Sequence, residues 1–268
     1  MSREISMAQL RAVTQPDSVC GRANAEHWVA DFYLRKISPY LTRVQIRMNF
    51  SQNAVTWLMI LTGLATAFSL LIPGLIGVTL ALVLGQLQML WDCCDGEVAR
   101  WRKQSSPARI FLDKLGHYMT DSAIAVALGL RLGDWPQQSL GQNSLPTIGT
   151  IFAVIILLNK SLNDGVHVSR YFTGLPRLED GKPASDSRTP LVNQTKKIFK
   201  IVPIHRMFHS VEMTIWILLM SIVNEILNIN LLVSIFSWII PISLFVFIGH
   251  LISILTSNKL QSKEKGYE

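Results

Sequence analysis

The chain alternates long apolar stretches with short polar ones, and this pattern predicts a bundle of membrane-spanning helices. A helix needs about 20 apolar residues to cross a bilayer. Six stretches come close to this length, at residues 54–73, 74–92, 118–133, 147–163, 211–228 and 231–255. The third extends into a polar part if its helix begins at Pro107, because proline suits the first helical turn. We therefore predict an all-α, polytopic integral membrane protein with six transmembrane helices.

An amphipathic segment precedes the first span. Apolar residues between Trp28 and Val44 recur at helical spacing among basic residues, which is typical of a helix that lies in the membrane interface. A soluble amphipathic helix packed on the cytoplasmic loops is the alternative. The chain then divides into an N-terminal segment with the interfacial helix (1–50), a six-helix transmembrane domain (51–258) and a C-terminal tail (259–268).

Composition supports the membrane assignment, and the charges indicate an orientation. Hydrophobic residues make up 49% of the chain and charged residues 16%, and the mean hydropathy is positive, so a soluble core is not expected. The net charge is +7, but the basic residues cluster in alternate linkers, which favours anionic lipid over nucleic acid as the partner. The positive-inside rule then places these linkers and both termini in the cytoplasm. We expect a multi-pass protein of the inner or plasma membrane.

Acidic residues at the end of the second span give the strongest chemical signal. Asp92 and Asp95 fall on one face of the helix. Ionisable residues are costly at membrane depth and normally face a cavity or a partner. Asp113 and His117 lie one turn apart at the start of the next span, where the helix hairpin returns them to the same depth. The sequence therefore predicts that three carboxylates and an imidazole converge.

This cluster favours a hard divalent cation. Carboxylates so close together need a cation between them, and oxygen ligands without Cys/His spacing of zinc type suit Mg²⁺ or Mn²⁺. Gly96 and Ala99 are small enough to let a ligand approach the helix, and Arg100 can donate to a phosphate. The alternative is a solvated helix end whose carboxylates pair with Arg100 or Arg102.

These residues resemble the signature of the CDP-alcohol phosphotransferase (CDP-alcohol phosphatidyltransferase) family. The signature is Asp-x2-Asp-Gly-x2-Ala-Arg, eight residues, and then Gly-x3-Asp-x3-Asp. This sequence has the same spacing: Asp92-x2-Asp95-Gly96-x2-Ala99-Arg100, eight residues, Arg109-x3-Asp113-x3-His117. Six of the eight defined positions match. The start of the first span is also similar to the family, at Asn53, Thr56 and Gly63.

The resemblance implies a transferase of phospholipid biosynthesis. In such a reaction a CDP-linked donor, commonly CDP-diacylglycerol, gives its phosphatidyl group to an alcohol acceptor and releases CMP. The resemblance implies Mg²⁺ or Mn²⁺ on Asp92, Asp95 and Asp113. It also implies nucleotide contacts from Asn53, Thr56, Gly96, Ala99 and Arg100. Many family members are homodimers, which leaves a homodimer open for this chain.

Two departures from the signature affect the site. Arg109 replaces a glycine, which changes how closely the third span approaches the nucleotide or adds a phosphate contact. His117 replaces the last aspartate, which the family assigns as general base. An imidazole with a pKa of about 6.5 removes a hydroxyl proton well at neutral pH, and Asp121, four residues on, can orient the ring. A metal-ligand role and a loss of activity are the other interpretations of His117.

The remaining candidates concern the acceptor and the class of function. His167 and Arg170 follow the fourth span at helical spacing, where with Arg109 they can hold an acceptor's phosphate or hydroxyls. A basic interfacial anchor is the alternative for the first two. Two other function classes stay open: a catalytically silent membrane protein that binds nucleotide or lipid, and a cation transporter that uses intramembrane carboxylates.

Overall fold

The chain folds into helices throughout its described parts. The computed structural model describes residues 5–17, 19–20, 29–104, 106–176, 178 and 209–260. The long helices are α3 (Gln52–Leu70), α4 (Gly74–Arg102), α5 (Pro107–Leu132), α6 (Leu145–Phe172), α8 (Ser210–Leu227) and α10 (Ile239–Leu255). The shorter elements are α1 (Met7–Thr14), the π-helix η1 (Ala30–Leu34), α2 (Arg35–Arg47), α9 (Leu231–Ser237) and the 3-10 helix η3 (Asn258–Leu260). Most of the polar segment between the fourth and fifth predicted spans, and the tail after residue 260, lie outside the described residues.

Helices occupy all six predicted positions, but the count of six membrane spans is not confirmed. Within the described ranges, α3, α4, α6 and α8 are long and apolar enough to cross a membrane. A fifth span results if α9 and α10, which are bent by 45° at their break, are taken together. Helix α5 has 26 residues, but its first half carries charged side chains. The structure is therefore that of an all-helical, multi-pass membrane protein with four or five candidate spans.

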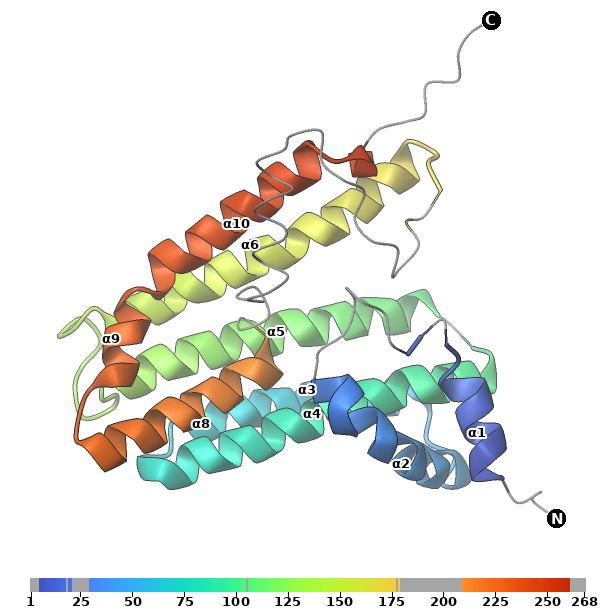
Figure 1. Ribbon diagram of the computed structural model, residues 1–268, viewed down its shortest axis with the longest axis horizontal. Coiled ribbons are helices and arrows are strands. Elements are labelled where there is room, and N and C mark those ends of the chain that lie inside the picture. Colours follow the sequence, from blue (N-terminus) through green and yellow to red (C-terminus); the bar gives the residue numbers. More distant parts are fainter. Residues whose placement is uncertain are drawn as a thin grey trace, which may run out of the picture.

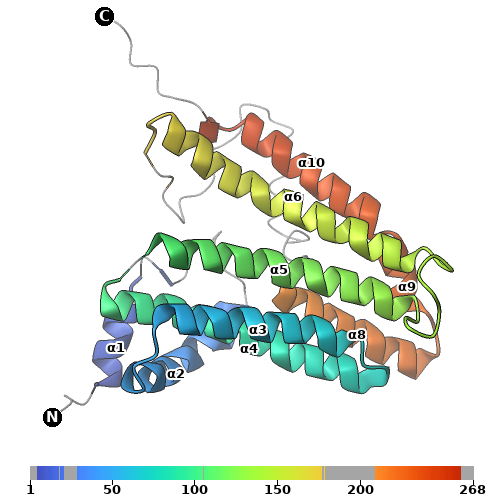
Figure 2. The ribbon, with the colours of Figure 1, turned by 180° about the vertical axis from the view of Figure 1, so that it is seen from behind.

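Helix α5 lies in the middle of the bundle. Helices α3, α4 and α8 lie on one side of it, and α6 and α10 lie on the other, as Figures 1 and 2 show from opposite directions. Small residues permit these close approaches. A Cβ atom at Gly63 of α3 would lie 2.1 Å from Oγ1 of Thr120 on α5. A Cβ atom at Gly149 of α6 would lie 2.9 Å from Cα of Gly129 on α5.

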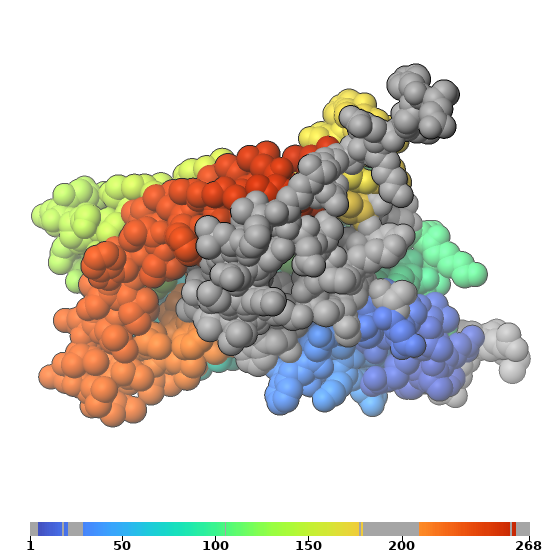
Figure 3. All heavy atoms as spheres, turned by 45° about the horizontal axis from the view of Figure 1, so that its top comes forward, coloured from blue at the N-terminus to red at the C-terminus, as the bar shows by residue number. Residues whose placement is uncertain are grey.

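The N-terminal helices pack beside the C-terminal half of α4 (Figure 1). The space-filling view in Figure 3 places them, in blue, and helices α8 and α9, in orange, toward opposite ends of the molecule. The inward face of α2 is polar and includes Ser38 and Thr42, whereas the apolar side chains of Ile37, Tyr40 and Val44 are exposed. An apolar face turned away from the protein is what a helix at a lipid surface requires. Interfacial placement remains a prediction that this geometry supports.

A tight connection between α4 and α5 positions the candidate site. Helix α4 ends at Arg102, and Lys103 follows in the left-handed conformation (φ 51°), which is a common way to end a helix. Helix α5 begins at Pro107, as predicted, and the Ser106 hydroxyl accepts a hydrogen bond from the backbone N–H of Arg109 at 3.1 Å. The hairpin therefore brings the end of α4 beside the start of α5.

Candidate active site

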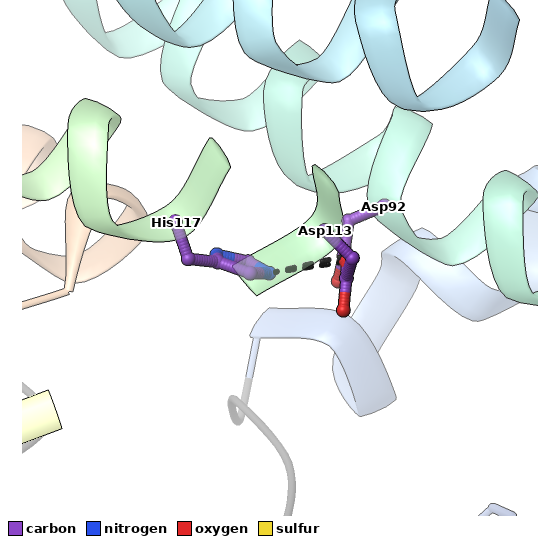
Figure 4. Close-up of side chains that lie close together, drawn as sticks. All are labelled: Asp92, Asp113 and His117. Atoms are coloured by element: carbon purple, nitrogen blue, oxygen red, sulfur yellow. Dashed lines mark hydrogen bonds and ion pairs between the residues drawn. The ribbon is translucent and has the colours of Figure 1, made fainter. Parts of the chain in front are cut away.

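Three of the predicted residues converge between α4 and α5. Nε2 of His117 lies 3.3 Å from Oδ1 of Asp92 and 3.8 Å from Oδ1 of Asp113. Asp113 and His117 are one turn apart on α5, and Asp92 reaches them from α4 (Figure 4). All three side chains are about one quarter exposed, with values of 27%, 26% and 22% for Asp92, Asp113 and His117. The group is therefore partly buried but open to a ligand.

The geometry of this group fits a divalent cation. One ligand atom from each of Asp92, Asp113 and His117 can be chosen so that all three lie within 4.8 Å of one another. Oxygen ligands bind Mg²⁺ at about 2.1 Å, so ligands on opposite sides of the ion are about 4.2 Å apart. The three side chains could enclose such an ion with small movements. The two carboxylates are oxygen ligands that Mg²⁺ and Mn²⁺ prefer, whereas an imidazole is a ligand that transition metals favour.

Asp95 does not join this group, although the sequence places it on the same face as Asp92. Its side chain is fully buried and forms a two-point ion pair with Arg109. Nε of Arg109 lies 3.1 Å from Oδ1, and Nη2 lies 2.9 Å from Oδ2. The helical spacing of α4 was predicted correctly, but a long side chain from α5 reaches across the hairpin and engages Asp95. Arg109 therefore contacts a carboxylate where an acceptor or phosphate contact was predicted.

Asp121 has other partners than the predicted one. Its carboxylate is 1% exposed and lies 2.7 Å from Nζ of Lys160 on α6. It also accepts a hydrogen bond from the backbone N–H of Ser210 at 3.0 Å, at the start of α8, and lies 3.5 Å from Nδ1 of His209. These contacts join α5 to α6 and α8. The sequence predicted that Asp121 would orient His117, but in the structure Asp121 forms an ion pair with Lys160. Helical spacing within α5 could not predict this partner, because Lys160 lies on α6.

The predicted nucleotide-binding residues differ in their surroundings. Asn53 is exposed at the start of α3, whereas Thr56 is buried and its hydroxyl donates to the Gln52 carbonyl at 3.2 Å. Gly96 lies directly beneath Arg100, because a Cβ at Gly96 would be 3.2 Å from Nη1 of Arg100.

The Arg100 side chain also has a partner in the N-terminal segment. Its Nε donates to the carbonyl of Thr14 at 2.6 Å, at the end of α1. Ala99 is 8% exposed on the neighbouring turn. The segment from Gly96 to Arg100 therefore lies close to the site but is covered in part by α1.

The two weaker acceptor candidates on α6 are not alike. Arg170 is 8% exposed, and its guanidinium donates to the carbonyls of Pro176 and Lys259 at 2.6–3.0 Å. These bonds fasten the end of α6 to the chain that follows it and to η3. His167 is partly buried one turn after Asp164. Arg170 therefore has structural partners in this arrangement, and its predicted contact with an acceptor stays a prediction.

Sequence reasoning missed polar residues at three places near the site. Lys160 lies inside the fourth predicted span, where a charged residue by itself indicates a functional or paired group, and this signal was available. Tyr118 and Lys114 of α5 both contact Asp164 of α6, at 2.6 Å and 3.0 Å. Glu97, at an undefined position of the signature, is fully buried. No helical spacing reveals these partners, because they lie on different helices.

Long apolar helices around a partly buried carboxylate and histidine group define a multi-pass membrane protein with a candidate divalent-metal site. Residues 50–173 match the sequence model of CDP-alcohol phosphatidyltransferase. This part of the chain, from the start of α3 to the end of α6, is therefore a domain of that family, whose members are transferases of substituted phosphate groups. No curated protein matches the chain. The resemblance drawn from the signature is confirmed, and the matched segment contains all three residues of the candidate metal group.

Proposed function

We propose that this protein transfers a phosphatidyl or other phospho-alcohol group from a CDP-linked donor to a hydroxyl acceptor in a divalent-metal-dependent reaction. CDP-diacylglycerol is the favoured donor. The observation that carries the proposal is the convergence of Asp92, Asp113 and His117 within 4.8 Å inside the segment that matches the family. In the reaction the acceptor oxygen forms a bond to the phosphorus that carries the alcohol group. The bond from that phosphorus to the oxygen of CMP breaks, and the hydroxyl proton is released.

Asp92 and Asp113 would hold the ion. A bound divalent ion supplies positive charge to the diphosphate of the donor and to the leaving CMP. We assign His117 as the third ligand, because Nε2 is the atom turned toward both carboxylates. A ring nitrogen that binds a metal cannot take up a proton at the same time. This assignment differs from the general-base role that the sequence suggested, and the two can be separated by experiment.

The donor would enter beside the last turns of α4. Gly96 and Ala99 are small, so this part of α4 presents little bulk to a ligand. Arg100 offers a guanidinium that suits a phosphate. Arg100 already donates one hydrogen bond to Thr14, and an arginine has five N–H donors, so it can keep that bond while contacting a donor. Basic linkers on one side of the predicted spans support a cytoplasmic site, where CDP-linked donors would reach it.

The test is CMP release by purified protein in lipid nanodiscs. Radiolabelled CDP-diacylglycerol or another radiolabelled CDP-alcohol is supplied with Mg²⁺ or Mn²⁺ and a panel of alcohols, and the product is identified. The wild type should form a product with at least one alcohol, and Asp92→Asn should reduce turnover by about 10²-fold or more, as loss of preorganised charge stabilisation does. Glu225→Gln is the control, because Glu225 is exposed on α8. Absence of product with every donor and alcohol would refute the proposal and favour a catalytically silent protein.

The role of His117 is decided by a second measurement on the same samples. His117→Ala should weaken Mn²⁺ binding, and His117→Asp should restore it, because an aspartate supplies an oxygen ligand. If His117→Ala instead binds Mn²⁺ as the wild type does but loses about 10²–10⁴-fold in turnover, the residue is a general base and the ligand assignment is wrong.

A further inference from the structure

Arg109 and Asp95 form the most closely matched ion pair of the site. The two side chains meet through two nitrogen–oxygen contacts of 3.1 Å and 2.9 Å, the arrangement in which a guanidinium binds a carboxylate most specifically. Asp95 is fully buried, and the Arg109 side chain is 16% exposed. A guanidinium cannot be deprotonated in a protein. Arg109 is therefore a permanent positive charge next to the candidate metal group.

This pair divides the two carboxylates of α4 between different partners. Asp92 faces Asp113 and His117, and belongs to the group that can hold an ion. Asp95 lies one turn further along the same helix, but each of its oxygens is engaged by Arg109. A carboxylate held in this way has to give up its guanidinium before it can bind a metal. Asp95 is thus withheld from metal binding by a residue of this chain.

The charges of the site follow from this division. The family signature has four aspartates and a glycine at these positions, whereas this chain has three aspartates, an arginine and a histidine. Arg109 neutralises Asp95, and one divalent ion balances Asp92 and Asp113. A second divalent ion would find only the carboxylates of Asp92 and Asp113, whose negative charge the first ion already balances.

We propose that Arg109 takes the place of a second divalent ion, so that the site binds one ion through Asp92, Asp113 and His117. Of the five N–H donors of the guanidinium, the one on Nε donates to Asp95, and Nη2 is in ion-pair contact with it. Those that remain give Arg109 the means to contact a phosphate oxygen of the donor, as an added ion would. This last role rests on the proposed function, whereas the number of ions does not.

The experiment counts Mn²⁺ bound to the purified protein, by electron paramagnetic resonance of free Mn²⁺ and by elemental analysis after gel filtration. The wild type should bind one ion per chain. Asp95→Asn should still bind one, because Asp95 is not a ligand, whereas Asp92→Asn should bind none. Arg109→Gly should bind a second ion, and adding Asp95→Asn to that variant should remove it again. Arg102→Gly is the matched control, because Arg102 makes an exposed hydrogen bond with Asn49 and should leave the count at one.

The outcomes separate this inference from the proposed function. Two ions in the wild type would overturn it, and so would loss of the ion in Asp95→Asn or a single ion in a folded Arg109→Gly protein. If Arg109→Gly fails to elute as a folded protein, the comparison of Asp95→Asn with Asp92→Asn still decides. A protein that binds one ion as described but forms no lipid product keeps the inference and loses the proposed function. A protein that releases CMP while binding two ions supports the proposed function and refutes this inference.

Discussion

Glu97 is expected to hold the N-terminal helices against α4, and its replacement tests this directly. Its carboxylate is fully buried and accepts three hydrogen bonds, from Nε2 of Gln15 at 2.7 Å, Oγ of Ser38 at 2.5 Å and Oγ1 of Thr42 at 2.6 Å. Gln15 follows α1, and the two hydroxyls belong to α2. One side chain of α4 therefore fastens two helices that are far from it in sequence.

Glu97→Ala should reduce the stability of the docked N-terminal helices more than Glu97→Gln does. Alanine leaves the hydroxyls of Ser38 and Thr42 without their acceptor, whereas Nε2 of Gln15 keeps its hydrogen bond to the Arg35 carbonyl. Each buried donor left unsatisfied costs about 1–3 kcal/mol. The hydroxyls of Ser38 and Thr42 can turn to backbone carbonyls one helical turn back, so we expect a total of about 2–4 kcal/mol for the variant. Glutamine keeps one oxygen, and its amide can donate to the Thr42 hydroxyl. Its cost should be about 1 kcal/mol.

Native-state proteolysis measures this difference. Trypsin cleavage after Arg11 of α1 should require release of that helix, and its rate tracks the population of the open form when closing is fast. A loss of about 2–4 kcal/mol corresponds to roughly 30- to 700-fold faster cleavage, since each 1.4 kcal/mol is a factor of ten. Glu97→Gln should be about fivefold faster than the wild type, and the exposed control Glu225→Ala should be unchanged. Equal rates for Glu97→Ala and Glu225→Ala would refute this account of how the N-terminal helices are held.

Three further predictions concern packing, buried charge and metal. Lys160→Met should destabilise the protein by about 3–5 kcal/mol, because Asp121 loses the cation 2.7 Å from it. Thermal unfolding in detergent measures this loss, and adding Asp121→Asn should recover part of it. Equal melting temperatures for the single and double variants would contradict the prediction. Gly63→Ala should lower the free energy of unfolding by about 1–3 kcal/mol, because its Cβ would lie 2.1 Å from Oγ1 of Thr120. Adding Thr120→Ala should restore most of the melting temperature. A single variant as stable as the wild type would disprove the close contact. Treatment with EDTA should abolish CMP release, and either Mg²⁺ or Mn²⁺ should restore it; turnover that persists in the chelator would exclude a metal requirement.

The positions of the helices could be predicted from the sequence because they depend on apolar length and on local end signals. Pro107 marks the start of α5 in both the sequence and the structure. The last predicted span differs, because it is broken between α9 and α10 with a bend of 45°. The run from 231 to 255 contains a signal for that break that the prediction of one continuous span did not use. Pro241 has no backbone N–H, and its ring would clash with the carbonyl of Ser237, four residues earlier, where α9 ends.

The candidate metal group could be predicted in part for the same reason. Residues one turn apart on a helix share a face, and a short hairpin aligns the end of one helix with the start of the next. These two rules bring Asp92, Asp113 and His117 together. They cannot predict that Arg109 forms an ion pair with Asp95. The position of the long Arg109 side chain depends on how α4 and α5 are rotated against each other. The contact of Asp121 with Lys160 depends in a similar way on how α5 and α6 pack against each other.

The signature helix acts on two faces, and this explains why an undefined signature position is buried. Successive residues of an α-helix are rotated by about 100°, so Asp92 and Asp95 lie near one another, whereas Glu97 lies about 200° beyond Asp95 and faces the opposite side. The first face meets α5 and contributes Asp92 to the candidate metal group and Asp95 to the pair with Arg109. The second meets α1 and α2 through Glu97. Replacing Glu97 should therefore loosen the N-terminal helices while the Mn²⁺ count stays at one, and replacing Asp92 should remove the ion while those helices remain docked.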